Sequence, residues 1–336
     1  MVDRQTQPLV TVIATCFNHE RFVIECLESV RAQTYQNVQL IIMDDRSTDG
    51  SVRLIQDWVN RTGTECMLIL HDENRGVCRT RNEALSHARG RYISSLSTDD
   101  TWYPEKLAVQ VEQFESVPET VGVLYSDAEL MDVDGCALPR MFFESSRHVR
   151  SFADPPEGDI FAKLLEVVFV PAMTTMIRRE CFARVGPYDE SLAYEDWDML
   201  LRLARRFDFG FTPYVCARYR IHESSLSHTL GSRGLESDIQ IFLKHVDYSP
   251  QTDALLWDRI ARLSYRLGQP EQRAYARSNL RTNMSLRALA LYLLCLTKIP
   301  YRWVAPLKRA ARRASAPLRP TRYERRERVV ATETSL

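Results

Sequence analysis

Three acidic clusters contain the residue types needed to bind a nucleotide, hold a cation or move a proton. Asp45 follows one apolar run, and the adjacent pair Asp99 and Asp100 follows another. Carboxylates at the carboxyl ends of parallel strands can accept hydrogen bonds from a nucleobase or a ribose. Two neighbouring carboxylates repel each other unless a divalent cation that also binds phosphate neutralises them. Asp196, in the acidic segment 195–198, could serve as a general base.

Each cluster taken alone also has a structural explanation. Ser47 and Asp49 precede a predicted helix, and for these two residues we favour a capping role. For Asp45 we favour a ligand. The pair at 99–100, taken alone, fits an exposed turn with two solvated aspartates. The segment 195–198, taken alone, fits the first turn of a helix, where negative charge is favourable.

Two further segments carry basic or polar groups. Residues 74–82 place Gly76 and three arginines between a predicted strand and a predicted helix. Backbone N–H groups and arginines at a helix start suit a pyrophosphate, although neither a dinucleotide fingerprint nor a Walker A loop is met. His222, within 219–225, is by itself more typical of a surface or packed residue.

The elements that must position these residues alternate between strands and helices. The predicted strands are 9–14, 38–43, 66–70 and 92–96, and the predicted helices are 20–33, 47–60 and 77–88. This alternation indicates βαβ units, and the continuous apolar strands indicate a parallel sheet covered on both faces. Further predicted elements are a helix over 106–115, strands over 121–125 and 174–177, helices over 179–184 and 196–207, and successive helices over 237–307. Residues 140–159 are polar and irregular, which is typical of a mobile loop.

The order and spacing of these segments resemble the inverting glycosyltransferases of family 2, which have the nucleotide-sugar-binding GT-A fold. The resemblance runs from about Val10 to Ser227, roughly two thirds of the chain. The residues that carry it are 10–18 (VTVIATCFN), 29–35 (SVRAQTY), 44–50 (DDRSTDG), 74–76 (NRG) with 81–82 (RN), 97–100 (STDD), 125–127 (YSD), 186–190 (GPYDE), 195–198 (EDWD) and 219–222 (YRIH).

The resemblance implies an α/β fold with a Rossmann-like, mixed but mainly parallel sheet flanked by helices, and with a C-terminal helical extension. The expected domains are a catalytic domain over 1–236, a helical region over 237–315, and a basic, disordered tail over 316–336. The implied reaction transfers a sugar from a nucleotide-diphosphate donor to a hydroxyl of a glycan or lipid-linked acceptor. The favoured donor is a UDP-sugar. Such a step belongs to the synthesis of polysaccharide, lipopolysaccharide or another glycoconjugate.

The resemblance also implies roles for single residues. Asp196 would be the general base, and Asp100 with His222 would hold Mg²⁺ or Mn²⁺. Asp45 would accept from the base, most simply from N3–H of uracil or thymine. The implied donor-binding residues are Thr15, Phe17, Asn18, Asp45, Asn74, Gly76, Arg81 and Asp99.

The sequence departs from the family pattern at three positions. Phe17 keeps the ring but lacks the hydroxyl of the tyrosine that is common there. Many relatives place an aspartate two residues before Asp99, where this chain has Ser97. Thr15 stands where a proline is common.

The net charge of zero hides an uneven distribution. The chain has 44 basic and 44 acidic residues, but residues 298–336 contain 11 basic and 3 acidic residues. The apolar segment 286–296 followed by this basic stretch is typical of a peripheral helix on an anionic membrane. A packed helical subdomain with a solvated basic tail explains the same pattern, and both interpretations stay open. No nucleic-acid-binding module accompanies the arginines, so no nucleic acid partner is expected.

The remaining features favour a cytoplasmic enzyme, peripheral at the cytoplasmic face of a membrane if the first of these interpretations holds. The eight cysteines form no Cys-x-x-Cys pair, the N-terminus lacks the apolar core of a signal peptide, and the longest apolar run, 288–296, is too short to span a bilayer.

Two other classes of protein stay as alternatives to a glycosyltransferase. One is a non-catalytic nucleotide-sugar-binding or membrane adaptor protein, and the other is a nucleotidyltransferase, although residues 14–18 lack its glycine-rich basic loop.

Overall fold

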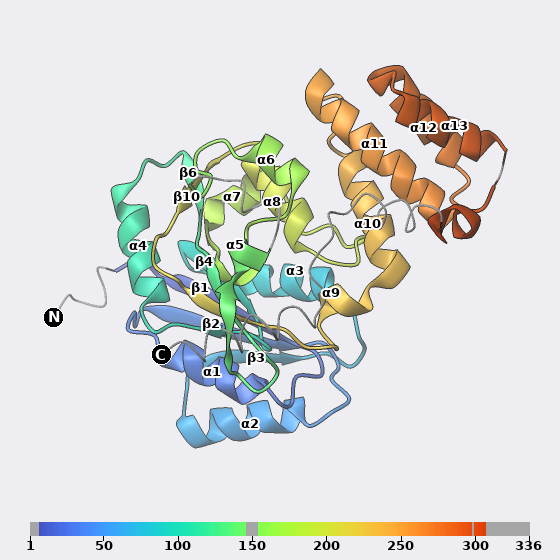
Figure 1. The fold of residues 1–336 in the computed structure, drawn as a ribbon. Coiled ribbons are helices and arrows are strands. Elements are labelled where there is room, and N and C mark those ends of the chain that lie inside the picture. Colours follow the sequence, from blue (N-terminus) through green and yellow to red (C-terminus); the bar gives the residue numbers. More distant parts are fainter. Residues whose placement is uncertain (1–6, 146–153, 298, 307–336) are drawn as a thin grey trace, which may run out of the picture. The chain divides into compact units, whose positions relative to one another are not determined.

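The computed structural model describes residues 7–145, 154–297 and 299–306, and the chain divides into two compact units. Unit 1 is Met1–Lys244 and unit 2 is His245–Leu336. Figure 1 shows the helices and strands of both units along the chain. The expected boundary after residue 236 falls within the helix α10 (Gly231–Leu243), and the expected tail over 316–336 lies outside the described residues.

Unit 1 is built on a mainly parallel sheet of seven strands. In chain order these are β1 (Val10–Cys16), β2 (Val38–Asp44), β3 (Cys66–Leu70), β4 (Tyr92–Ser97), β6 (Val121–Tyr125), β9 (Met176–Arg178) and β10 (Asp208–Phe211). Their order in the sheet is β10-β6-β9-β4-β1-β2-β3. β1 pairs in parallel with both β2 and β4, whereas β9 runs antiparallel to β4 and β6.

Helices cover both faces of this sheet (Figure 1). The helices of unit 1 other than α10 are α1 (Val23–Arg31), α2 (Ser51–Thr62), α3 (Val77–His87), α4 (Lys106–Ser116), α5 (Phe142–Ser145), α6 (Phe161–Glu166), α7 (Arg179–Val185), α8 (Asp196–Ala204) and α9 (Leu226–Thr229), with the 3₁₀ turn η2 (Ala172–Thr174). Successive side chains of a strand point to opposite faces. Val12 and Ala14 therefore pack in one core with α1, α2 and α4, while Ile13 packs in a second core that includes α3 and Phe182 of α7. The predicted sheet, covered on both faces, is confirmed.

A second, four-stranded sheet in unit 1 was not predicted. Its strands are β5 (Thr101–Trp102), β7 (Ala128–Met131), β8 (Ala137–Met141) and β11 (Ala217–Arg220), in the order β5-β11-β7-β8. The expectation of an irregular segment over 140–159 is wrong at its start, where β8 ends and α5 follows. Residues 146–153 of that segment lie outside the described residues.

In the described part of unit 2, helices α11 (Pro250–Leu267), α12 (Gln272–Asn283) and α13 (Leu286–Leu296) pack on one another. Ser249 caps α11 by accepting from the backbone N–H of Thr252, and Pro250 occupies the first turn, where its missing N–H costs nothing. The buried core of the unit comprises Ala261, Tyr265, Ala276, Leu291 and Cys295. Within the described ranges, none of the helices combines the length and apolar character that crossing a membrane requires.

Lys106, the first residue of α4, is fully buried against the sheet of unit 1. Its Nζ donates to Ser94 Oγ at 2.6 Å and to Gln110 Oε1 at 2.7 Å, and it lies 4.4 Å from the ring centroid of Trp102. None of the ion pairs in the described part of the chain involves Lys106. Burial lowers the pKa of Lys106 to about 7.

We therefore expect Lys106 to make the stability of unit 1 depend on pH. Between about pH 7 and 10 the unfolded chain binds the lysine proton while the folded state does not, so the free energy of unfolding rises with pH, by up to about 1.4 kcal/mol per pH unit. Lys106→Met removes this contribution. The unfolding free energy of the wild type minus that of the variant, measured by urea titration at pH 7 and pH 9.5, should be larger at pH 9.5. A difference independent of pH would contradict a neutral buried lysine.

Candidate active site

The carboxyl ends of β1, β2 and β4 meet at one edge of the sheet. Thr15 of β1 lies opposite Ser97 of β4, and Cys16 lies opposite Asp44 of β2. A cavity of about 560 Å³ opens beside this edge. Five predicted site residues line it, Thr15, Arg81, Asp99, Asp100 and Asp196. The structure thus brings the predicted base Asp196 and the adjacent carboxylates Asp99 and Asp100 into one cavity, whereas His222, the other predicted cation ligand, does not line it.

The other predicted site residues lie around this cavity. Asn18 and His222 line a neighbouring cavity of about 640 Å³. Phe17 is 45% exposed, which leaves its ring free to pack on a bound ring system. Asp45, Asn74 and Gly76 form a separate cluster at the start of α3.

Asp45 organises the turn that leads into α3. Its Oδ1 accepts from the backbone N–H of Arg75 at 2.8 Å, and its Oδ2 accepts from the N–H of Gly76 at 2.9 Å. The Asn74 side chain donates to the carbonyl oxygen of Asp45 at 3.1 Å. His71, a residue we did not single out from the sequence, lies with Nδ1 2.8 Å from Asp45 Oδ1. A histidine directly after the apolar run 66–70 was the signal in the sequence that could have identified it.

The turn after β2 corrects the predicted capping roles. α2 begins at Ser51, four residues later than predicted, and Gly50 is its N-cap. Ser47 instead turns back to Asp44, donating from its backbone N–H and from its hydroxyl to the two carboxylate oxygens. Ser47 Oγ also accepts from the N–H of Asn18 at 2.8 Å, so this serine joins the ends of β1 and β2. Asp49 accepts from the N–H of Ser51, which satisfies the first helical residue without Asp49 being the N-cap.

Asp99 and Asp100 are buried next to each other. Burial alone raises the pKa of Asp99, but hydrogen bonds from His222 and Ser97 help to lower it below its usual range. Burial, and then the negative charge of Asp99, raise the pKa of Asp100 well above its usual range. His222 Nε2 lies 3.0 Å from Asp99 Oδ2, so in this structure His222 supports the carboxylate directly.

The environment of this pair fits a divalent cation completed by a ligand. Asp99 Oδ1 is buried and has no hydrogen-bond partner, and the raised pKa of Asp100 shows that a second negative charge is costly there. In the described part of the chain, no group of three or more His, Cys, Asp or Glu side chains is placed to hold a metal by itself. Mg²⁺ and similar ions typically take one or two carboxylates, with phosphate oxygens and water as the remaining ligands.

In the lining of the same cavity, Arg81 of α3 meets the start of α8. Arg81 Nη1 lies 3.0 Å from Glu195 Oε1, and both side chains are buried. Arg81 Nε is buried without a partner and is thus able to donate to a ligand. Burial, and then the negative charge of Glu195, raise the pKa of Asp196 to about 6. A carboxylate with such a pKa is suited to accept a proton near neutral pH.

The overall fold is similar to that of a solved mannosyltransferase, PcManGT from Pyrobaculum calidifontis, in complex with GDP-Man and Mn²⁺. The TM-score is 0.57 at 20% identity, and the match covers 90% of this chain and 85% of that chain. The mainly parallel sheet, its two helical layers and this similarity define the fold class. The protein has the GT-A fold of nucleotide-sugar glycosyltransferases.

The sequence comparisons give the family. The family described as "Glycosyl transferase family 2" matches residues 11–186, just over half of the chain. EpsE of Bacillus subtilis, named as a glycosyltransferase, is 37% identical over 223 residues, which cover 65% of this chain and 74% of EpsE. WfgD of Escherichia coli, named as a UDP-Glc:alpha-D-GlcNAc-diphosphoundecaprenol beta-1,3-glucosyltransferase, is 24% identical over 222 residues, covering 65% of this chain and 79% of WfgD. The chain belongs to glycosyl transferase family 2.

The Arg81–Glu195 pair generates a test of the site's architecture. Removing one partner of a buried ion pair leaves the other charge uncompensated, at a cost of about 3–5 kcal/mol. We therefore expect Arg81→Met to lower the free energy of unfolding by several kcal/mol. The double variant with Glu195→Leu should recover part of this loss because both charges are then gone. Urea unfolding followed by circular dichroism measures both effects, and losses that simply add would show that the pair is not coupled.

Proposed function

We propose that this family 2 glycosyltransferase is an inverting, metal-dependent enzyme that transfers a sugar from a nucleotide-diphosphate donor, most simply a UDP-sugar, to a hydroxyl acceptor. The observation that supports this most directly is the placement of Asp196. It lies half-buried at the start of α8, its pKa is raised to about 6, and it lines the same cavity as Asp99 and Asp100. A candidate base and a candidate phosphate-binding edge in one cavity suit direct displacement.

The proposed reaction is a single displacement at the anomeric carbon. Asp196 takes the proton of the acceptor hydroxyl while that oxygen forms a bond to the anomeric carbon. The bond from this carbon to the diphosphate oxygen breaks on the opposite side, so the configuration inverts and the nucleoside diphosphate leaves. Holding donor and acceptor in line in the cavity supplies much of the rate.

The proposed donor contacts come from several elements that line the cavity or lie beside it. Asp100 and His222, with Asp99 next to them, would hold Mg²⁺ or Mn²⁺, which would neutralise charge developing on the leaving diphosphate. Arg81, with its unpaired Nε, would donate to a phosphate or sugar oxygen of the donor. Thr15, Phe17, Asn18 and Asp45 would surround the nucleoside. The named donor of WfgD supports a UDP-sugar, and the ligands of PcManGT support a nucleotide sugar with a cation.

The proposed acceptor is a glycan or a lipid-linked sugar in the synthesis of polysaccharide or another glycoconjugate. The name of WfgD, whose acceptor is a diphosphoundecaprenol-linked sugar, supports this class. In this chain, Leu226 of α9 and Leu230 and Leu235 from the α10 region line the cavity that also contains Asp196. An acceptor with an apolar portion would find contacts there. We also propose that the enzyme works in the cytoplasm, at the surface of an anionic membrane.

We expect Asp196→Asn to reduce transfer by roughly 10²–10⁴-fold, because the amide cannot accept the hydroxyl proton. Donor affinity should stay close to that of the wild type. In the wild type, kcat/KM should fall below about pH 6, since protonation of Asp196 (whose pKa is about 6) removes the base. Transfer assays over a pH series, together with calorimetric donor binding, measure these effects.

Glu195→Gln is the matched control for this interpretation. The charge of Glu195 contributes to the raised pKa of Asp196, so the variant should move the acid limb of the pH profile to lower pH. Full transfer activity in Asp196→Asn would exclude Asp196 as the base. Loss of donor binding in that variant would indicate a structural role instead, and wild-type protein that binds donor but never transfers sugar would favour a non-catalytic adaptor.

We expect Asp100→Asn to abolish the cation dependence of donor binding. Wild-type affinity for a UDP-sugar should be at least about tenfold higher with Mn²⁺ than with a chelator, because the cation joins the carboxylates to the diphosphate. The variant should bind the donor equally weakly in both conditions, and Mn²⁺ binding measured by electron paramagnetic resonance should weaken in parallel. Asp57→Asn, an exposed carboxylate on α2, is the control. Cation-independent donor binding in the wild type would reject the metal assignment.

A further inference from the structure

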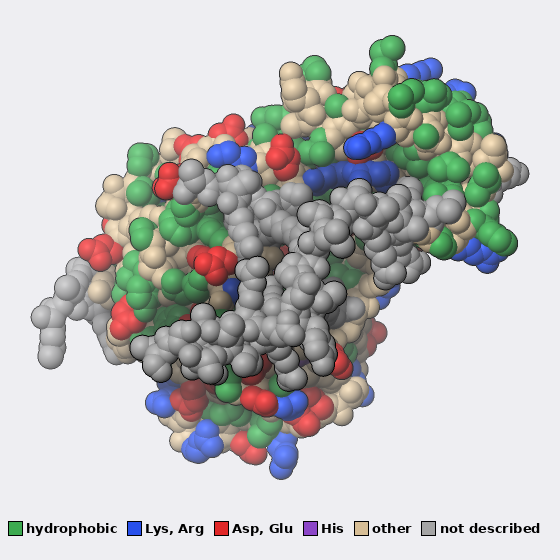
Figure 2. All heavy atoms as spheres, viewed as in Figure 1, with side chains coloured by type: hydrophobic (Ala, Val, Ile, Leu, Met, Phe, Trp, Pro, Cys, Tyr) green, Lys and Arg blue, Asp and Glu red, His purple; other side chains and the backbone are tan. Residues whose placement is uncertain are grey.

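Unit 2 exposes an apolar stripe along α13. The stripe comprises Leu286, Leu289, Leu293 and Leu296, whose side chains are between 40% and 85% exposed. Their spacings of three, four and three residues place them on one side of the helix. Figure 2 shows hydrophobic side chains gathered over the α12 and α13 part of this unit, with basic side chains among them.

The packing of unit 2 does not use this stripe. The opposite side of α13 presents the buried residues Ala288, Leu291 and Cys295, and the last two belong to the core that α13 forms with α11 and α12. α13 therefore has one apolar face for folding and a second apolar face left in water. Four leucines along one solvent-exposed face lower the solubility of a protein, and such a face is typical of a surface that binds an apolar partner.

The chain around the stripe is basic and aromatic. Trp303 is 68% exposed, and Arg287 and Arg302 are exposed as well. The described residues 272–297 and 299–306 contain five arginines and no acidic residue. A second copy of the chain docking on this face would bring two such segments together, so like charges oppose that occupant. An anionic surface is favoured instead.

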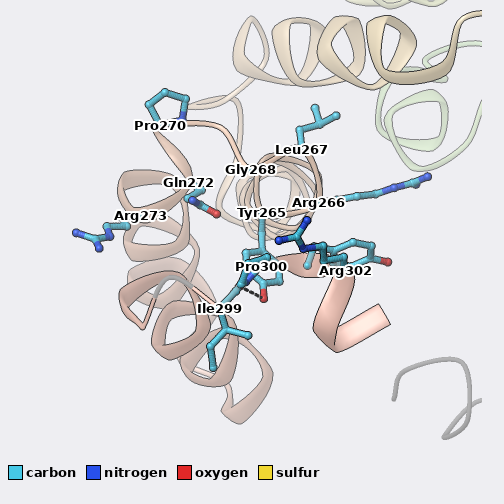
Figure 3. A pocket seen from close by; sticks show the side chains of 11 residues that line it. Tyr265, Arg266, Leu267, Gly268, Pro270, Gln272, Arg273, Ile299, Pro300 and Arg302 are labelled. Atoms are coloured by element: carbon cyan, nitrogen blue, oxygen red, sulfur yellow. Dashed lines mark hydrogen bonds between the residues drawn. The ribbon is translucent and has the colours of Figure 1, made fainter. Parts of the chain in front are cut away.

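A cavity beside the stripe adds to this positive character. It has a volume of about 660 Å³ and lies between the end of α11, the start of α12 and the segment after α13 (Figure 3). Arg266, Arg273 and Arg302 are among its lining residues. Arg273 also donates to the carbonyl oxygens of Cys295 and Leu296, which satisfies the last turn of α13 next to the stripe.

We propose that this stripe is the membrane-docking surface of the enzyme, and that its partner is an anionic phospholipid bilayer. α13 has 11 residues and is thus about 16 Å long, half the thickness of a hydrocarbon core, so it lies in the plane of the interface. Its leucines enter the acyl boundary, Trp303 lies at the headgroup level, and the arginines contact lipid phosphates. The proposal rests on the proposed function in that a lipid-linked acceptor would be presented at such a surface.

The test uses the full-length protein and vesicle flotation. Wild type should float with vesicles that contain phosphatidylglycerol and should not float with pure phosphatidylcholine. Leu289→Gln with Leu293→Gln should weaken binding at least about tenfold, because two partly inserted leucines are lost. The matched control is Met67→Gln with Leu70→Gln on β3, since these side chains are 39% and 40% exposed but lie in unit 1. The control should bind as the wild type does.

Donor binding, measured on the same preparations, separates this proposal from the proposed function. If donor binding is absent but the stripe variant still loses vesicle binding, the docking surface stands alone. The proposal would be overturned if the wild type did not bind anionic vesicles, or if the stripe variant bound them as well as the wild type does. It would also be overturned if the wild type were a dimer and the stripe variant a monomer. Should the stripe variant misfold, a blue shift of Trp303 emission on anionic vesicles, isolated by comparison with Trp303→Phe, supports it, and unchanged emission overturns it.

Discussion

The repulsion between Asp99 and Asp100 is the constraint around which unit 1 is arranged. Two adjacent carboxylates are withdrawn from water where β4 ends, and such a pair needs compensating donors or a cation. The donors come from far along the chain. Arg220, 1% exposed, donates from its backbone N–H to Asp100 Oδ1 at 2.9 Å and from its Nε to the carbonyl oxygen of Asp99 at 2.8 Å. His222 supports Asp99 from two residues further on.

This requirement gives the second sheet its role. Arg220 is the last residue of β11, whose parallel partner is β7, and its Nη1 donates to carbonyl oxygens of Asp132 and Val133 in the turn after β7. Its Nη2 lies against the carboxylate of Glu25 on α1. One buried guanidinium thus connects the small sheet, the end of β4 and a helix that covers the large sheet. Because a buried arginine without these acceptors would be costly, the small sheet and the carboxylate pair stabilise each other's position.

Those parts of the fold with a local signal could be predicted from the sequence, and those that depend on distant contacts could not. β3 and β6 were predicted at their observed bounds because each is a continuous apolar run, although only β6 is largely buried. β11 (Ala-Arg-Tyr-Arg) has no such run. Its two arginines donate hydrogen bonds to carbonyl oxygens elsewhere in unit 1, and these contacts leave no local signal in the sequence.

The cap expected at Ser47 is wrong because this serine hydrogen-bonds to Asp44, three residues earlier, instead of capping the helix. The pairing of Arg81 with Glu195 spans 114 positions, and only the folded chain brings the two together.

The same electrostatic reasoning bears on Ser97, one of the three residues that depart from the expected pattern. Ser97 lines the cavity, and its side chain helps to lower the pKa of Asp99. A third carboxylate at this point would add to a repulsion that already raises the pKa of Asp100 well above its usual range. A serine hydroxyl instead stabilises the ionised form of Asp99, so one member of the pair carries the charge and the other is kept close to neutral. A bound cation would remove this asymmetry, and ionisation of Asp100 would then be linked to the arrival of the donor diphosphate.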